Sequence, residues 1–206
     1  TEAGDWGAFH VLAEVDETSG AFPALRMAGF SVYAWQRIWD VSHITPRAPS
    51  NGWARMQSVN LSAVQSLYHQ IVPPLLQPVE PAPKHAVGLV CSDCLRCYVN
   101  LTYGAYGIML TPLIHPEAAD VVAKLTGLLN HLPDRRNRPV YLCVRSYQAW
   151  LEPVLEDLGA KSSERQAVMV KHLASAIKNG QTARATQPSV VVQASRIAPN
   201  DEKSSR

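Results

Sequence analysis

No run in the 206 residues reaches the roughly 18 consecutive apolar side chains that a membrane-spanning helix needs. The N-terminus also lacks the basic and then apolar pattern of a secretory signal. A charge excess of one sign is missing too, because 19 lysines and arginines face 17 aspartates and glutamates. The composition therefore gives no support for a nucleic-acid or anionic-membrane partner. We expect a cytoplasmic globular protein, since 47% hydrophobic content suffices for a sizeable core.

Cysteine is scarce, and three of the four cysteines stand in the run CSDCLRC, at Cys91, Cys94 and Cys97. This spacing can begin an iron-sulfur or zinc site, but Leu101 stands where a ferredoxin-like run would place its next cysteine. No histidine pair or second C-x-x-C completes a ligand set. The apolar flanks and the Ser-Asp turn signal favour a hairpin with reduced, buried or turn cysteines, so we expect no metal.

Apolar periodicity predicts alternating strands and helices along most of the chain. Strands are expected in GAFHVLAEV, SVYAWQRIWDV, AVGLVC, LRCYVNLTY, YGIMLTPLI, PVYLCV and QAVMVKHL, and three consecutive ones imply a meander. Helices are expected in PALRMAG, in LSAVQSLYHQIV with Asn60 as its cap, in residues 117–132 and in QAWLEPVLEDLG. The third of these helices has an apolar stripe made of Val121, Val122, Leu125, Leu128, Leu129 and Leu132.

An internal repeat relates the two ends of this pattern. Residues 9–41 and residues 139–173 share one order of strand, short amphipathic helix, glycine and strand. Laying Gly29 on Gly159 also puts Gln36 on Gln166. We interpret residues 1–43 as the closing half of a first domain, 44–52 as a linker, 53–174 as a second copy and 175–206 as a disordered tail. The alternative is chance agreement between two common strand-helix-strand units.

The order of elements in the second copy resembles the GNAT superfamily of acyl-CoA-dependent N-acetyltransferases. The stretch GIMLTPLIHPEAADVVAKLTGLL is similar to the family's fourth strand and central helix. RPVYLCVRSYQAWLEPVLEDLG is similar to the fifth strand and its following helix, and AFPALRMAGFSVYAWQRIW to the same ending in the first copy. The resemblance implies an α/β fold with a twisted mixed sheet flanked by helices and splayed after the fourth strand.

The resemblance also implies a cofactor and a substrate class. Acetyl-CoA would lie along the fourth strand, with its diphosphate on backbone N–H groups at the start of the central helix. The matching positions here are Leu113, Ile114, His115, Ala118 and Ala119. The acyl acceptor would be a small-molecule or peptide amine.

The chain departs from the family pattern at two places. The glycines expected at the start of the central helix are absent, and Glu117 and Asp120 place carboxylates where a diphosphate would lie. We interpret these two as stabilisers of the first helical turn. Leu155 stands where many members of the family have a tyrosine that protonates the leaving thiolate. Tyr147 is therefore our candidate for the catalytic acid. His115, at the strand exit, is an alternative candidate base or a turn residue.

Two functions follow from these observations. The first is an acyltransferase that transfers an acyl group from acetyl-CoA to an amine. The second is a catalytically silent pseudo-acetyltransferase that serves as a binding or structural module, with intramolecular or homodimeric pairing of GNAT-like units. The missing glycines and Leu155 favour the second, whereas the fold-level likeness favours the first by association. The basic loop at residues 135–138 is either a solvated face or a contact for an anionic partner.

Overall fold

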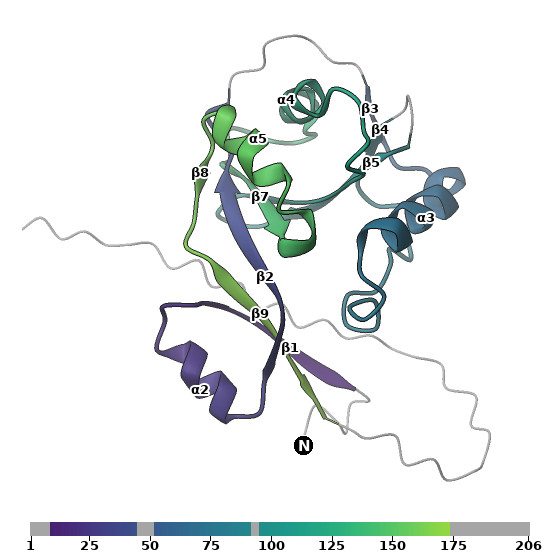
Figure 1. Ribbon diagram of the computed structural model, residues 1–206. Coiled ribbons are helices and arrows are strands. Elements are labelled where there is room, and N and C mark those ends of the chain that lie inside the picture. The colour runs from purple at the N-terminus through teal and green to yellow at the C-terminus, as the bar shows by residue number, and fades with distance from the viewer. Residues whose placement is uncertain (1–8, 45–51, 92–94, 174–206) are drawn as a thin grey trace, which may run out of the picture.

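One continuous nine-stranded sheet runs through the molecule (Figure 1). The computed structural model describes residues 9–44, 52–91 and 95–173. The expected tail at 175–206, most of the expected linker and Cys94 therefore lie outside the described residues. The strand order is β1-β9-β2-β7-β6-β5-β4-β3, with β8 paired to β2. Within the described part, no helix is long and apolar enough to cross a bilayer.

The elements confirm the predicted α/β class with a mixed sheet flanked by helices. The strands are β1 (His10–Asp16), β2 (Ser31–Asp40), β3 (Trp53–Arg55), β4 (Leu89–Cys91), β5 (Cys97–Tyr103), β6 (Ile108–Ile114), β7 (Val140–Arg145), β8 (Lys161–Ser162) and β9 (Gln166–His172). The helices are α2 (Ala21–Met27), α3 (Leu61–Ile71), α4 (Val121–His131) and α5 (Leu151–Asp157), with short 3-10 turns η1 (Ser58–Asn60) and η2 (Ser146–Gln148). The predicted meander is β4, β5 and β6, which pair antiparallel.

Helix α3 follows from its sequence pattern. Val64, Leu67 and Tyr68 are buried on one face, as a 3.6-residue period predicts. The predicted cap is wrong, because the Asn60 side chain makes no capping bond to α3. Its carboxamide oxygen instead accepts a hydrogen bond from the Gln57 N–H, 3.0 Å away, and closes the preceding turn η1. The helix therefore continues from an existing turn and starts without a side-chain cap.

Helix α4 begins four residues later than the periodicity predicts. Asp120 adopts the left-handed conformation, with φ of 52°, so the chain turns sharply before the helix begins at Val121. Glu117 consequently lies outside the helix and pairs with Arg96 at 3.5 Å, which corrects its expected role in the first turn. Asp120 makes no side-chain cap bond. The stripe is also narrower than predicted, since Val122 is exposed.

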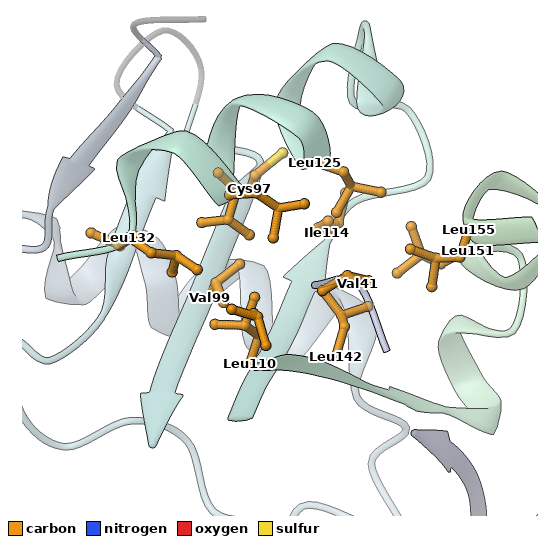
Figure 2. Packing of buried hydrophobic residues seen from close by; sticks show 14 of the residues in the cluster. Val41, Cys97, Val99, Leu110, Ile114, Leu125, Leu132, Leu142, Leu151 and Leu155 are labelled. Atoms are coloured by element: carbon orange, nitrogen blue, oxygen red, sulfur yellow. The ribbon is translucent and has the colours of Figure 1, made fainter. Parts of the chain in front are cut away.

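Two apolar cores hold the helices on the sheet. The larger core joins α4 and α5 to the sheet, and Leu125, Leu151 and Leu155 meet Leu110 and Leu142 there (Figure 2). The smaller core lies under α3 and joins its buried face to side chains of the meander, namely Val90, Tyr98 and Leu113. Each fully buried leucine contributes about 2 kcal/mol of transfer free energy, so the two cores fix all three helices on the sheet.

The strands of residues 1–43 belong to the same sheet as the rest of the chain. Strand β2 pairs antiparallel with β7 and with β9, and β1 pairs with the other edge of β9. Strand β9 thus lies between β1 and β2, and β2 lies between β9 and β7. Gln36 and Gln166, which the predicted repeat superposes, are directly opposite each other in the β2–β9 ladder, and their side chains are joined by a 2.8 Å hydrogen bond.

Candidate functional site at the splay between β6 and β7

The parallel strands β6 and β7 separate after three paired residues. Their ladder runs from Ile108 and Val140 to Leu110 and Leu142 and then ends. Strand β6 continues to Ile114 and β7 to Arg145. Beyond the ladder, backbone groups of β6 that point toward β7 need other partners, because an unpaired buried peptide group costs free energy.

The side chain of Gln148 supplies those partners. It projects from η2, directly after β7, and is only 1% exposed. Its amide oxygen accepts a hydrogen bond from the Ile114 N–H at 2.9 Å, and its amide nitrogen donates to the Pro112 carbonyl at 2.8 Å. One primary amide therefore acts as a single added peptide unit along the edge of β6. The backbone groups that an extended amide-bearing ligand would use there are already bonded within the chain.

The loop before α4 is held by neighbouring side chains. The His115 carbonyl accepts a bond from the Ala118 N–H, and its Nδ1 accepts one from the Glu117 N–H at 3.2 Å. The Arg96 guanidinium donates to the Glu117 carbonyl at 3.1 Å, and the Lys124 ammonium donates to the Ala119 carbonyl at 2.8 Å. Two backbone N–H groups near the helix start therefore point back into the loop, and the Glu117 carboxylate stands exposed beside them.

The residues expected to bind the cofactor have different environments in this arrangement. Leu113 and Ile114 are buried core residues of β6, and Ala118 is buried as well. Ala119 is exposed, and His115 is half-buried with its Nδ1 occupied. These five positions follow one another along the end of β6 and the loop after it. Whether they bind a cofactor stays a prediction.

A second polar group lies on the other side of β7, and we call it the Glu80 cluster. Glu80 accepts hydrogen bonds from the Tyr33 hydroxyl at 3.0 Å and from the Tyr147 hydroxyl at 2.8 Å. Its carboxylate lies 3.1 Å from the Arg145 guanidinium, which also contacts Glu14 at 3.2 Å. Glu80 comes from the proline-rich connector after α3, so the cluster ties this connector across the ends of β2 and β7.

Burial shapes the ionisation of the Glu80 cluster. Burial, reinforced by the nearby Glu80 carboxylate, raises the pKa of Tyr33 and of Tyr147, so both hydroxyls remain protonated donors. Burial is the largest single influence on Arg145 and disfavours its charged form, but the neighbouring acidic groups, Glu80 first among them, together outweigh it and raise the pKa of Arg145 above its ordinary value. Burial also raises the pKa of the Cys143 thiol to about 12, so this thiol is a poor nucleophile at neutral pH.

Tyr147, the candidate acid, therefore lies in the cluster and not in the splay. Its hydroxyl donates to Glu80, while its neighbour Gln148 occupies the edge of β6. Leu155, at the position of the family's acidic tyrosine, is 1% exposed in the larger core. Its repeat counterpart Leu25 is an equally apolar residue of α2. Neither leucine can donate a proton, and the catalytic role of Tyr147 stays a prediction.

The cysteines and the basic loop, which the sequence also offered as binding residues, take part in packing and in hydrogen bonds within the chain. Cys91 and Cys97 are fully buried in the predicted hairpin of β4 and β5. In the part of the chain that the structure describes, no three histidine, cysteine or acidic residues are grouped as metal ligands. The guanidinium of Arg135 donates to the Ser42 carbonyl at 2.9 Å, so part of the basic loop fastens the end of β2.

Sequence reasoning missed the residues that dominate the site. These residues come from three separate segments of the chain, with Tyr33 in the first, Glu80 in the second, and Arg145 and Gln148 in the third. The available signal was weak: a glutamine directly after a buried strand, and one carboxylate inside a proline-rich connector. Only the topology brings them to the two sides of β7.

Solved structures share this architecture. An acetyltransferase of the GNAT family from Colwellia psychrerythraea matches with a TM-score of 0.52 and 11% identity, over 78% of this chain and 65% of that one. A GNAT-family structure from Novosphingobium aromaticivorans gives 0.52 and 11% over 81% and 76%. A GCN5-related N-acetyltransferase from Sphaerobacter thermophilus, at 16% identity and a TM-score of 0.45, matches over 79% of this chain and 59% of its own length.

The two comparisons with a TM-score of 0.52 support the fold. No protein-family model matches it, and no curated protein matches it in sequence. The chain spans less than two thirds of the Colwellia and Sphaerobacter structures. At 11% identity, the likeness concerns the fold alone, and the chain has the twisted mixed sheet and flanking helices of GNAT acetyltransferases.

Proposed function

We propose that this chain is a catalytically silent module with an acetyltransferase fold, which binds or supports another protein unit. The observation that carries the proposal is the Gln148 amide on the edge of β6, where it bonds the Ile114 N–H and the Pro112 carbonyl. By the resemblance, the pantetheine arm of acetyl-CoA would need this same edge. A bound cofactor would have to displace a side chain that is almost fully buried and doubly bonded.

The start of α4 supports the same proposal. A diphosphate needs several N–H groups directed outward and a backbone that it can approach closely. Here Ala118 and Glu117 direct their N–H groups to His115, and the Glu117 carboxylate would repel a phosphate. The Glu80 cluster supports the proposal as well. In it, the Tyr147 hydroxyl donates to the Glu80 carboxylate and does not point into the gap between β6 and β7.

Acyl transfer from acetyl-CoA to an amine is the second candidate function. The splayed end of β6 and β7, with a helix following β6, favours it, because that geometry is the one the resemblance implies for an acyl-CoA site. In this case Gln148 would have to leave the edge of β6 when the cofactor binds. A tyrosine such as Tyr147 would then have to exchange its bond to Glu80 for the leaving thiolate.

Acetyl-CoA is expected to leave the melting temperature of this chain unchanged at concentrations far above micromolar. A ligand that binds only the folded state adds about 2.7 kcal/mol to the free energy of unfolding at 100 times its Kd. This added stability raises the melting temperature. Differential scanning fluorimetry with acetyl-CoA at 1 µM to 1 mM measures this, with sodium phosphate at equal ionic strength as the control. A saturable upward shift of several degrees, absent in phosphate, would show that acetyl-CoA binds and would favour the acyltransferase candidate over the silent module.

We also propose that the chain contains a tandem arrangement of two units of the same plan. The units are β1-α2-β2 and β7-α5-β9. Gln36 and Gln166, which pair across the sheet, are 130 positions apart. Shifting the bounds of α2 by the same 130 positions gives the bounds of α5. Gly29 and Gly159 follow the two helices and have φ of 87° and 79°, a conformation that glycine adopts readily.

A further inference from the structure

The outer edge of β1 differs from that of β7, its counterpart in the repeat. Strand β7 has β6 alongside it as a parallel neighbour, and four of its six residues are buried. Strand β1 pairs with β9 on one side, and among the described residues no strand lies on its other side. None of its residues is buried. In the part of the chain that the structure describes, the first unit therefore has no counterpart of the strand that lies beside β7 in the second.

The helices show the same difference. In α5, Leu151 and Leu155 are buried in the core that α4 and β6 complete (Figure 2). In α2 no residue is buried, and Met27, at its end, is 85% exposed. Phe9, just before β1, is 55% exposed. Figure 1 shows β1 and α2 together at the end of the sheet that is farthest from α4. Within the described residues, the outer edge of β1 has no neighbouring strand and α2 has no buried residue, and the two elements lie side by side.

The hydrogen-bonding groups of β1 that face outward can be identified. The Leu173 N–H donates to the Phe9 carbonyl, and the Glu17 N–H donates to the Arg165 carbonyl, so Phe9 and Glu17 face β9. Because these bonds alternate along an antiparallel ladder, the odd-numbered residues between them also face β9. The N–H and carbonyl groups of His10, Leu12, Glu14 and Asp16 therefore point away from β9. A sheet edge of this kind is a template for another strand.

We propose that a strand and helix of the same plan as β6 and α4 dock on β1 and α2, and that the same polypeptide supplies them ahead of β1. The strand would run parallel to β1, as β6 runs parallel to β7, and bond the outward groups of Leu12 and Glu14. The helix would cover the apolar side of α2, as α4 meets α5. This inference rests on the proposed tandem arrangement, and it makes the described sheet the joint between two acetyltransferase-fold domains.

Amide hydrogen exchange on two proteins tests the proposal. One protein is the 206-residue chain, and the other is the chain extended by the residues that precede it in its natural reading frame. In the 206-residue chain, the outward amides of Leu12 and Glu14 should exchange at least about 100-fold faster than the inward amides of Ala13 and Val15. In the extended protein, all four should be protected to a similar degree.

A proline pair provides the matched control. Leu12→Pro removes an outward N–H, so it should lower the melting temperature of the extended protein by several degrees and that of the 206-residue chain little. Ala13→Pro removes an N–H that faces β9, so it should destabilise both proteins. Fast exchange at Leu12 and Glu14 in the extended protein would overturn the proposal.

Analytical sedimentation of the 206-residue chain tests whether a second copy of the chain, instead of a preceding segment, pairs with the outer edge of β1. One contrary result is a tight dimer at micromolar concentration in which the Leu12 and Glu14 amides are protected, and in which Leu12→Pro removes that protection. This result would overturn the proposal and identify a second copy of the chain as the occupant. A monomer is the expected result. None of these outcomes depends on acetyl-CoA, so a failure here and a failure of the silent-module proposal can be told apart.

Discussion

Gln148→Ala is expected to lower the free energy of unfolding by about 3 kcal/mol, because it leaves two buried backbone groups without partners and opens a cavity. The Ile114 N–H and the Pro112 carbonyl lose the amide that bonds both of them. Urea unfolding followed by tryptophan fluorescence measures the change. The effect should be large for a glutamine, since most substitutions of polar surface residues change stability by less than about 0.5 kcal/mol.

Two further variants isolate the hydrogen bonds from the packing. Gln148→Met keeps the side-chain length and most of its volume but has no amide, so it should retain most of the loss. Gln70→Ala, at an exposed position of α3, should leave stability nearly unchanged. If Gln148→Met proved as stable as the natural chain, the amide would not be what closes the splay.

Arg145→Met is expected to lower the free energy of unfolding by about 3 kcal/mol, because it leaves the largely buried Glu80 carboxylate without its cation. The side chains of Arg145 and Glu80 are 14% and 15% exposed, so solvent screens their interaction weakly. The substitution also removes the contacts of the guanidinium with Glu14 and Gln36. Chemical denaturation at neutral pH provides the measurement.

A double variant distinguishes the buried charge from general damage. Adding Glu80→Leu to Arg145→Met removes the stranded carboxylate, so it should recover part of the lost stability. Arg96→Met breaks the exposed pair with Glu117 and should cost less than about 1 kcal/mol. Equal losses from Arg145→Met and Arg96→Met would mean that the Glu80 cluster contributes no more than a surface ion pair.

Local periodicity was sufficient to predict most elements of the fold. The buried face of α3 follows from Val64, Leu67 and Tyr68, because burial on one side of a helix imposes a 3.6-residue period. Strands β2 and β7 follow from their β-branched and aromatic runs. The start of α4 could not be predicted in this way, since the left-handed conformation of Asp120 carries no periodic signal.

From the sequence, only the position of a candidate site could be proposed. The resemblance located the end of β6 and the loop at residues 115–119, and the missing glycines indicated that a diphosphate fits poorly there. The bond from Gln148 to Ile114 could not be anticipated, because it joins residues 34 positions apart that meet only where β6 and β7 diverge. The Glu80 cluster was hidden for the same reason, since Tyr33 and Glu80 are 47 positions apart.

The backbone amide of Ile114 reports directly on whether the edge of β6 is closed to acetyl-CoA. A titration of the isotopically labelled chain with acetyl-CoA, followed by amide NMR spectra, resolves this single group and the side-chain amide of Gln148. We predict that both signals keep their positions up to millimolar cofactor. Saturable shifts of the Ile114 and Gln148 signals, together with that of Ala118, would show that the cofactor displaces Gln148 and would contradict the account.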